Sequence, residues 1–176
     1  IDSLSNSEFP IKGKHVINCT GIWSDDILEK CGCTRKTIRP TKGVHVQVPN
    51  ERLGNVNAYG VRSRDDGRFF FILRREHNSV IGTTDTDYKG PLDAPFCDKE
   101  DCDYLLNTVN WYFPDANLTY KDIVSTYAGI RPLILEEGKH ESKVSRKHEI
   151  MESENGVLTL AGGKLTIYRL MGEDLL

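Results

Sequence analysis

IRPTKGVHVQVP, which is Ile38–Pro49, ends in a run where apolar and polar residues alternate. Successive side chains of a strand point to opposite faces, so its valines share one face while His45 and Gln47 share the other. The stretch therefore predicts a long strand with its valine face in a core and His45 on the opposite side.

Hairpins are expected on both sides of this strand. Further strands are predicted at residues 15–20, 69–73, 79–84, 123–132, 147–152 and 157–161, with turns at 64–68, 76–78 and 155–156. Three helices are expected: one that Ser24 caps, one over residues 98–113 that Pro114 ends, and one that begins near Lys164. This pattern favours an α+β fold, a mostly antiparallel sheet with helices packed on one face.

The composition and net charge of the chain exclude several classes of protein. The chain has 176 residues, a formal net charge of -3 and 38% hydrophobic residues, with acids and bases mixed along it. A nucleic-acid-binding protein would carry a basic excess, so no nucleic acid is expected as a partner. No apolar run approaches the roughly 18 residues of a membrane-spanning helix, and the first ten residues lack signal-peptide features, which favours a cytoplasmic protein. The five cysteines fit no common zinc spacing, and no metal site is expected.

Four basic residues lie beside glycine or at a predicted strand end: His45, Arg131, Arg146 and Lys164. Arginine offers a planar fork of donors to phosphate oxygens, lysine offers a compact charge, and histidine exchanges a proton near neutral pH. Each of them alone also fits a structural role, as a salt-bridged surface residue or a histidine held in a strand.

Two glycine-containing turns are also candidates. Gly162 and Gly163 precede the last predicted helix, where free N–H groups favour negative charge such as that of a reduced flavin. A plain strand-to-helix turn would have the same sequence. The run IGTTDTD, residues 81–87, is explained by a hydrogen-bonded turn, so Asp85 and Asp87 are not expected to bind metal.

Six segments together resemble the flavin-dependent glycerol-3-phosphate dehydrogenases and the related alpha-glycerophosphate oxidases. They are residues 16–21, 39–45, 82–86, 128–133, 145–146 and 161–166, in the order of that family. The resemblance implies oxidation of sn-glycerol 3-phosphate to dihydroxyacetone phosphate by hydride transfer to FAD, with the electrons passed on to quinone. It also implies that the chain is the substrate-binding, or cap, part of an FAD-dependent oxidoreductase.

The resemblance implies roles for the four basic residues. His45 would remove the proton of the C2 hydroxyl or position that hydroxyl, and Arg131 would contact the substrate near the flavin. Arg146 would bind the phosphate. Lys164 would lie between the flavin and the substrate.

Cofactor contacts are implied in the same way. Gly21 would lie beside FAD. The residues Gly163, Lys164, Leu165 and Thr166 would place a helix start against the pyrimidine edge of the flavin.

The G-x-G-x-x-G fingerprint that binds the pyrophosphate of FAD does not occur in the sequence. The chain is therefore expected to be a truncated piece of a longer enzyme, inactive alone, with the N-terminal FAD-binding segment of the same protein as its partner. Residues 1–36 would be a remnant of the FAD-binding domain, 37–144 the substrate-binding domain, and 145–176 the strands and helix that return toward the FAD-binding domain. The intact enzyme would be cytoplasmic, with a peripheral contact on the inner face of the cell membrane.

Two alternatives remain open at this point. One is a related FAD-dependent oxidase that uses oxygen as acceptor or an amino acid as substrate, although the pair Arg131 and Arg146 favours a phosphate over a carboxylate. Some alpha-glycerophosphate oxidases carry a long insertion where only residues 134–144 lie here, which favours a dehydrogenase. The other alternative is a phosphate-binding module without redox chemistry.

Overall fold

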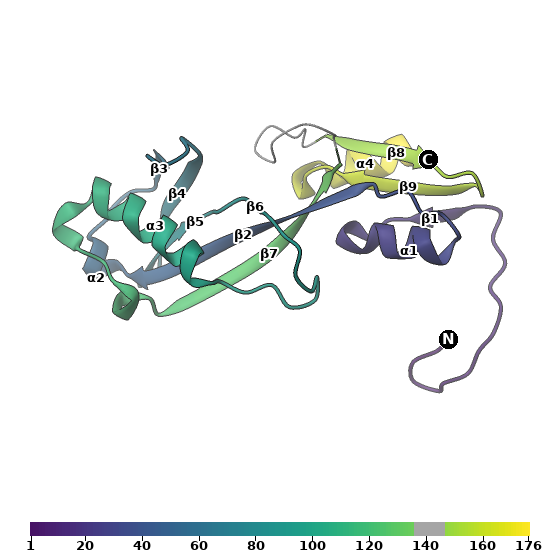
Figure 1. Cartoon of the computed structure of the whole chain (residues 1–176), viewed down its shortest axis with the longest axis horizontal. Helices are drawn as coiled ribbons and strands as arrows, with labels where there is room; N and C mark the ends of the chain where they lie inside the picture. Colours follow the sequence, from purple (N-terminus) through teal and green to yellow (C-terminus); the bar gives the residue numbers. More distant parts are fainter. Residues whose placement is uncertain (136–146) are drawn as a thin grey trace.

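The computed structural model describes residues 1–135 and 147–176, and its strands form two sheets toward opposite ends of an elongated molecule (Figure 1). The six-stranded sheet contains, in order, β3 (Tyr59–Arg62), β4 (Phe69–Arg75), β5 (Asn78–Gly82), β2 (Ile38–Pro49) and β6 (Thr86–Asp87), with β7 (Ser125–Ile134) also paired to β2. The three-stranded sheet contains β1 (Val16–Asn18), β9 (Val157–Gly162) and β8 (His148–Glu152).

Three helices lie between strands along the described chain, and a fourth follows the last strand. They are α1 (Ser24–Lys30), α2 (Asn50–Leu53), α3 (Lys99–Tyr112) and α4 (Tyr168–Leu175), with 3-10 turns at Gly21–Trp23, Pro114–Ala116, Tyr120–Asp122 and Leu165–Ile167. In the described ranges, none of the helices has the length and apolar character needed to cross a bilayer.

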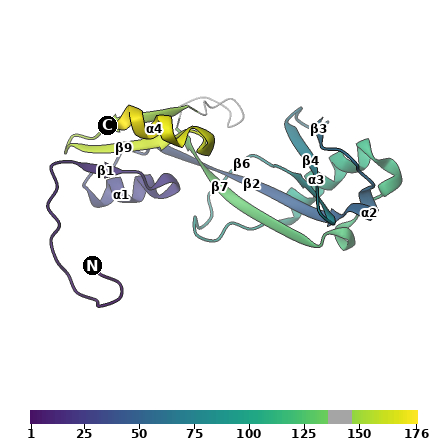
Figure 2. The ribbon, with the colours of Figure 1, turned by 180° about the vertical axis from the view of Figure 1, so that it is seen from behind.

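β2 and β7 form a long antiparallel ladder that runs between the two ends of the molecule (Figure 2). Its pairs extend from Ile38 with Ile134 to Gln47 with Ser125. At the end near the three-stranded sheet, Ile38 and Ile134 pack with Ala161 of β9 in a small apolar cluster. The ladder therefore connects the two sheets.

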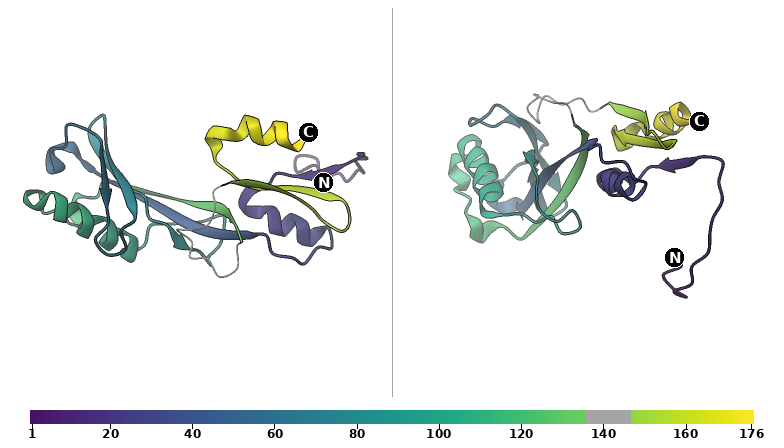
Figure 3. Two further views of the ribbon diagram at one scale, coloured as in Figure 1. Left: turned by 90° about the horizontal axis from the view of Figure 1, so that it is seen from above. Right: turned by 45° about the vertical axis from the view of Figure 1, so that its right-hand side comes forward.

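α3 covers one face of the six-stranded sheet, at the end of the molecule far from α4 (Figure 3). Its start is fixed by a capping box, in which the Asp98 side chain accepts from Asp101 N and the Asp101 side chain accepts from Asp98 N. Pro114 follows its last residues, as the sequence predicts. Its apolar side packs on a core that includes Val46, Val48, Phe70, Ile72, Ile81, Leu105 and Val109.

The alternation in β2 is confirmed. Val44, Val46 and Val48 are fully buried, whereas His45 and Gln47 are only half-buried. The face that carries His45 is the face that α3 does not cover, because α3 packs on the valine side. His45 therefore lies on an open face of the sheet.

The three-stranded sheet combines two kinds of pairing. β8 and β9 form an antiparallel hairpin around Asn155 and Gly156, and β1 pairs with β9 in parallel. Antiparallel strands can be joined by a tight turn, but parallel neighbours need a long crossover, here the whole segment from α1 to β8. The Gly21–Trp23 turn lies beside β9.

The expected α+β fold, mostly antiparallel with helices on one face, is confirmed, and the expected strands occur within a few residues of their predicted bounds. The strands divide into two sheets, however, and β3 and α2 had no clear sequence signal. The expected cap at Ser24 is wrong: α1 begins at Ser24 itself, and the Ser24 hydroxyl donates to the Gly21 carbonyl 2.8 Å away. The charged loop expected at 136–143 lies outside the described residues.

Candidate functional site

His45 is positioned by its neighbours on the open face of the six-stranded sheet. It pairs with Gly82 of β5 and with Tyr127 of β7, and paired residues point to the same face. Its imidazole stacks on the ring of Tyr127, with centroids 4.6 Å apart and 11° between the planes. A Cβ atom at Gly82 would overlap the imidazole, so glycine is required for this ring position.

Aromatic side chains lie on the same face of the sheet as His45. Phe71 pairs with Gly82, which places it in the same cross-strand row as His45 and Tyr127. Phe69, Phe71 and Tyr127 are each about half exposed, at 52%, 50% and 46%. An exposed aromatic surface of this kind is typical of a binding face.

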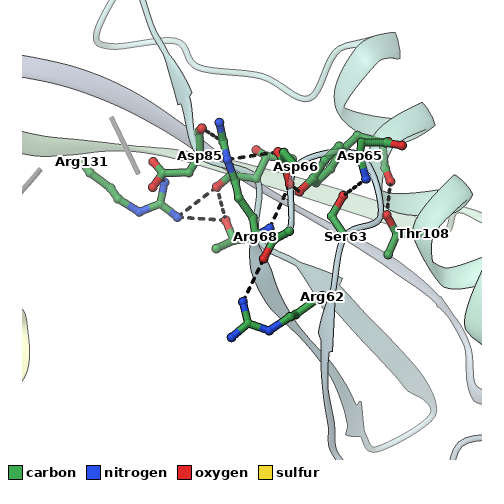
Figure 4. Close-up of polar contacts among 12 residues, drawn as sticks. Arg62, Ser63, Asp65, Asp66, Arg68, Asp85, Thr108 and Arg131 are labelled. Atoms are coloured by element: carbon green, nitrogen blue, oxygen red, sulfur yellow. Dashed lines mark hydrogen bonds and ion pairs between the residues drawn. The ribbon is translucent and has the colours of Figure 1, made fainter. Parts of the chain in front are cut away.

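Arg131 lies on the same face of β7, four residues from Tyr127, and its guanidinium is held in a fixed place (Figure 4). Its Nη1 donates to Asp85 Oδ1 at 3.1 Å, and its Nη2 donates to Thr83 Oγ1 at 3.0 Å and to the Thr84 carbonyl at 3.2 Å. On the other side the guanidinium lies against Gly43, where a Cβ atom would overlap it. Gly82 and Gly43 thus make room for His45 and Arg131, the two candidate catalytic side chains on this face.

Arg131 lines an open cleft of about 490 Å³. Its lining is Arg62, Asp66, Gly67, Arg68, Phe69, Phe71, Thr83, Asp85 and Arg131. Three arginines and two phenylalanines share this cleft with two carboxylates, and the excess of positive charge suits a small anionic ligand. His45 does not line this cleft, although it is close enough to Arg131 for their charges to interact.

The electrostatics of His45 favour a neutral ring. Burial lowers the pKa of His45, and the positive charge of Arg131 lowers it further. A neutral imidazole can accept a proton, and a protonated one cannot. The arrangement is therefore compatible with a general base at neutral pH.

A second group of candidate residues lies at the carboxyl ends of the parallel strands β1 and β9. Gly21 follows β1 with a φ of 61°, and Gly162 and Gly163 end and follow β9 with φ values of 71° and 81°. Lys164, Leu165 and Thr166 then begin a 3-10 turn that leads into α4, and all three are exposed. A Cβ atom at Gly21 would meet nothing within 4 Å, so a ligand can approach the backbone there.

This second group fits part of a flavin. Ligands of open α/β sheets bind outside the carboxyl ends of parallel strands, and a helix start offers N–H groups to a negatively charged ring edge. No side chain caps the 3-10 turn that follows Lys164, so the first backbone N–H groups of this turn are not taken by a capping residue. The residues suit a flavin ring, while the fingerprint for the pyrophosphate is absent from the sequence.

The structure brings only some of the predicted residues together. His45 and Arg131 share one face of the six-stranded sheet, while Gly21, Gly163 and Lys164 gather at the edge of the three-stranded sheet. Within the described part of the chain, no hydrogen bond or ion pair joins Lys164 to His45 or Arg131. Arg146 lies outside the described residues.

Sequence reasoning missed three contributors to the site. Tyr127 is found only through the register of β2 and β7. Asp85 lies in the IGTTDTD run, where the sequence suggested a turn, and its contact with Arg131 spans 46 residues. Arg68 belongs to a predicted hairpin turn, yet its Nη1 donates to the Asp85 carbonyl.

Comparisons with known proteins agree with this geometry. Residues 4–169 match the family model described as FAD dependent oxidoreductase. The chain is 46% identical over 176 residues to the aerobic glycerol-3-phosphate dehydrogenase of Staphylococcus aureus (strain USA300), covering 99% of the chain and 32% of that protein. It thus spans about a third of the length of the curated relatives it matches.

Solved structures give the same result. The glycerol-3-phosphate dehydrogenase from Bacillus halodurans complexed with FAD matches with a TM-score of 0.82 and 38% identity, covering 98% of this chain and 33% of that one. Iminodiacetate oxidase from Chelativorans sp. BNC1 matches with a TM-score of 0.61 at 20% identity, over 95% of this chain and 42% of that one, which supports the fold alone. The resemblance to the flavin-dependent glycerol-3-phosphate dehydrogenases is confirmed, and the chain belongs to the FAD-dependent oxidoreductase family.

Proposed function

We propose that this chain is the substrate-binding part of a longer flavoenzyme that oxidises sn-glycerol 3-phosphate to dihydroxyacetone phosphate. The observation that carries the proposal is the fixed Arg131 guanidinium on the same open aromatic face as half-buried His45, whose pKa is lowered by burial and by Arg131. The similarity to the aerobic glycerol-3-phosphate dehydrogenase supports the choice of substrate. The partner of the chain is then the N-terminal FAD-binding segment of the same protein.

When bound, FAD supplies the acceptor for the hydride that leaves C2 of the substrate. Gly21, Gly163, Lys164, Leu165 and Thr166 are the residues of this chain that would contact the cofactor. Their support is the open backbone at Gly21 and the helix start after β9. The domain division at 36 and 144 follows from this assignment, with residues 1–36 and 145–176 on the flavin side and 37–144 on the substrate side.

In this proposal each of the four basic residues has one role in binding or oxidising the substrate. His45 accepts the proton of the C2 hydroxyl as that carbon is oxidised, because its neutral ring has a free lone pair. Arg131 holds the substrate near the reacting carbon, and Lys164 contacts it from the flavin side. Arg146 binds the phosphate through its planar fork of donors.

The name of the relative supports a dehydrogenase rather than an oxidase, and we extend the proposal to its electron acceptor and location. Electrons would pass to a quinone, and the enzyme would be cytoplasmic with a peripheral contact on the inner face of the cell membrane. A use of oxygen as acceptor would mark it as an oxidase instead. The rate of oxygen consumption without added quinone separates the two.

The test of the substrate uses the full-length protein that contains this chain. Under anaerobic conditions, sn-glycerol 3-phosphate should bleach the flavin absorbance, while glycine and sarcosine should not. Reduction by the amino acids alone would establish the amino-acid oxidase alternative. A purified protein without flavin that still binds phosphate would support the non-redox module.

Arg146→Ala tests the phosphate contact in the same protein. Loss of a charge-assisted hydrogen bond of about 1.5–3 kcal/mol lowers kcat/KM for glycerol 3-phosphate by roughly 10- to 150-fold. Bound flavin should be retained. Unchanged kinetics would make Arg146 a surface residue without a role in substrate binding.

A further inference from the structure

Arg131 belongs to a series of polar contacts that reaches α3 through the turn between β3 and β4. Figure 4 shows Asp66, Arg68, Asp85 and Arg131 of this series. Tyr104 of α3 donates its hydroxyl to Asp66 Oδ1 at 3.0 Å, and Asp66 Oδ2 pairs with Arg68 Nε at 3.1 Å. Arg68 Nη1 in turn donates to the Asp85 carbonyl. The contacts link the outer helix to the segment that holds Arg131.

The segment Thr83, Thr84 and Asp85 presents three acceptors to one guanidinium. Asp85 Oδ1 and Thr83 Oγ1 lie 3.1 Å and 3.0 Å from the two terminal nitrogens of Arg131, and the Thr84 carbonyl lies 3.2 Å from the second. The Asp85 side chain is only 10% exposed, and that of Arg131 is 24% exposed. An arginine held at both ends of its fork has one orientation.

The acceptor segment is itself fixed to β2. Thr84 Oγ1 accepts from the Val44 backbone N–H at 2.9 Å, and Val44 follows Gly43 directly. The guanidinium therefore lies between the backbone of Gly43 and the acceptors that β2 anchors. Asp85 supplies the only carboxylate among these three acceptors, so its movement would remove the ion pair that orients one end of the fork.

We infer that Asp85 is a positioning residue for Arg131: its carboxylate, on a backbone whose carbonyl accepts from Arg68, holds the guanidinium at the substrate. The inference rests on the proposed function, since it assigns Arg131 a contact with the substrate. Asp85 acts only through Arg131. A purely structural ion pair would instead contribute to stability without any change in how the substrate is used.

The variant Asp85→Asn in the full-length enzyme removes the charge and keeps the shape. Its matched control is Asp87→Asn, two residues further along, where the carboxylate binds Arg39 at 2.6 Å and 2.6 Å on an exposed surface. We expect kcat/KM for sn-glycerol 3-phosphate to fall about 10- to 100-fold in Asp85→Asn, the usual cost of a misplaced positioning group. Asp87→Asn should stay close to wild type, and both folded variants should retain their flavin content.

A double-mutant cycle with Arg131→Gln isolates the coupling. If Asp85 acts through Arg131, the double variant should be no worse than Arg131→Gln alone. Additive losses, or an Asp85→Asn variant with wild-type kcat/KM beside an impaired Arg131→Gln, would overturn the positioning role and leave the proposed function intact. A wild-type Arg131→Gln would overturn the assignment of Arg131 itself.

Affinity gives a readout without turnover. Binding of dihydroxyacetone phosphate, measured by calorimetry on the full-length protein, should weaken in Asp85→Asn and not in Asp87→Asn. If Asp85→Asn does not fold, Asp85→Ser removes the same carboxylate with a smaller side chain. It should lower affinity in the same direction, and an unchanged affinity would refute the inference.

Discussion

The imidazole of His45 stacks on the phenol ring of Tyr127, 4.6 Å between centroids, and rests on Gly82 at the other side of β2. Neighbours on both adjacent strands therefore hold the ring. Its sequence neighbours Val44 and Val46 point into the core on the opposite face. The orientation of the ring is therefore fixed by packing against residues of β5 and β7.

His45→Ala in the full-length enzyme should slow flavin reduction by about 10²–10⁴-fold, the usual contribution of a general base. FAD content should be little changed. Stopped-flow reduction by sn-glycerol 3-phosphate measures the rate. His45→Gln keeps a donor but cannot act as a base, so a near wild-type rate in that variant would make His45 a positioning donor.

The pH dependence follows from the lowered pKa of His45. Because the base must be neutral, kcat/KM should be flat above pH 7 and fall only as pH drops through a pKa below the ordinary value of 6.5. Arg131→Gln removes a positive charge, so it should move the inflection upward, though only in part, because burial is the larger cause. His45→Gln supplies the control for ionisation of the substrate, and an inflection that survives in it belongs to another group.

Gly43→Ala should impair catalysis without unfolding the protein. Its Cβ atom would overlap the Arg131 guanidinium, the far end of a flexible side chain that can move away at low cost to stability. We expect kcat/KM to fall by about 10- to 100-fold with an unchanged Tm. Gly129→Ala is the matched control, because Gly129 pairs with Gly43 and its Cβ would meet nothing within 4 Å. Equal effects of the two variants would contradict the role of Gly43.

Lys42 should be essential for stability. Its ammonium lies 2.5 Å from both Asp98 and Asp101 at the start of α3, with 8% of its side chain exposed and 4% of that of Asp101. Burial alone would lower the pKa of Lys42, but its hydrogen bonds to Asp101 and Asp98 outweigh burial and raise it. Lys42→Met leaves Asp101 buried without its partner and should lower the free energy of unfolding by about 3–5 kcal/mol.

Denaturant unfolding measures this loss, and Lys99→Met is the control. Lys99 pairs with Asp103 four residues away, with 78% of its side chain exposed. Its removal should change the free energy of unfolding by less than about 0.5 kcal/mol. A similar decrease in the free energy of unfolding in both variants would show that burial of the Lys42 ion pair adds nothing to stability.

The 176-residue chain alone should not retain FAD, because its sequence contains no pyrophosphate fingerprint. Absorbance after incubation with FAD and desalting gives the measurement, with circular dichroism as the control for folding. A stoichiometric flavin band on the folded chain would refute this expectation.

The sequence by itself determined most of the elements, although not β3 and α2, and it determined the family. The alternation in Ile38–Pro49 predicted the strand and the side of His45, and the Asp98 to Pro114 segment predicted α3, because side-chain periodicity and caps are local properties. Six short segments in order were sufficient for the family, which the match over residues 4–169 confirms. The roles of His45, Arg131, Arg146 and Lys164 stay predictions.

Only the tertiary structure decided which side chains meet. The parallel pairing of β1 with β9, the stack of His45 on Tyr127 and the contact of Asp85 with Arg131 join residues 141, 82 and 46 positions apart. Such contacts depend on strand register, and a shift by one residue would turn every side chain to the other face. Local sequence carries no signal for a partner so distant, so Asp85 could be identified as a turn residue but not as the carboxylate that holds Arg131.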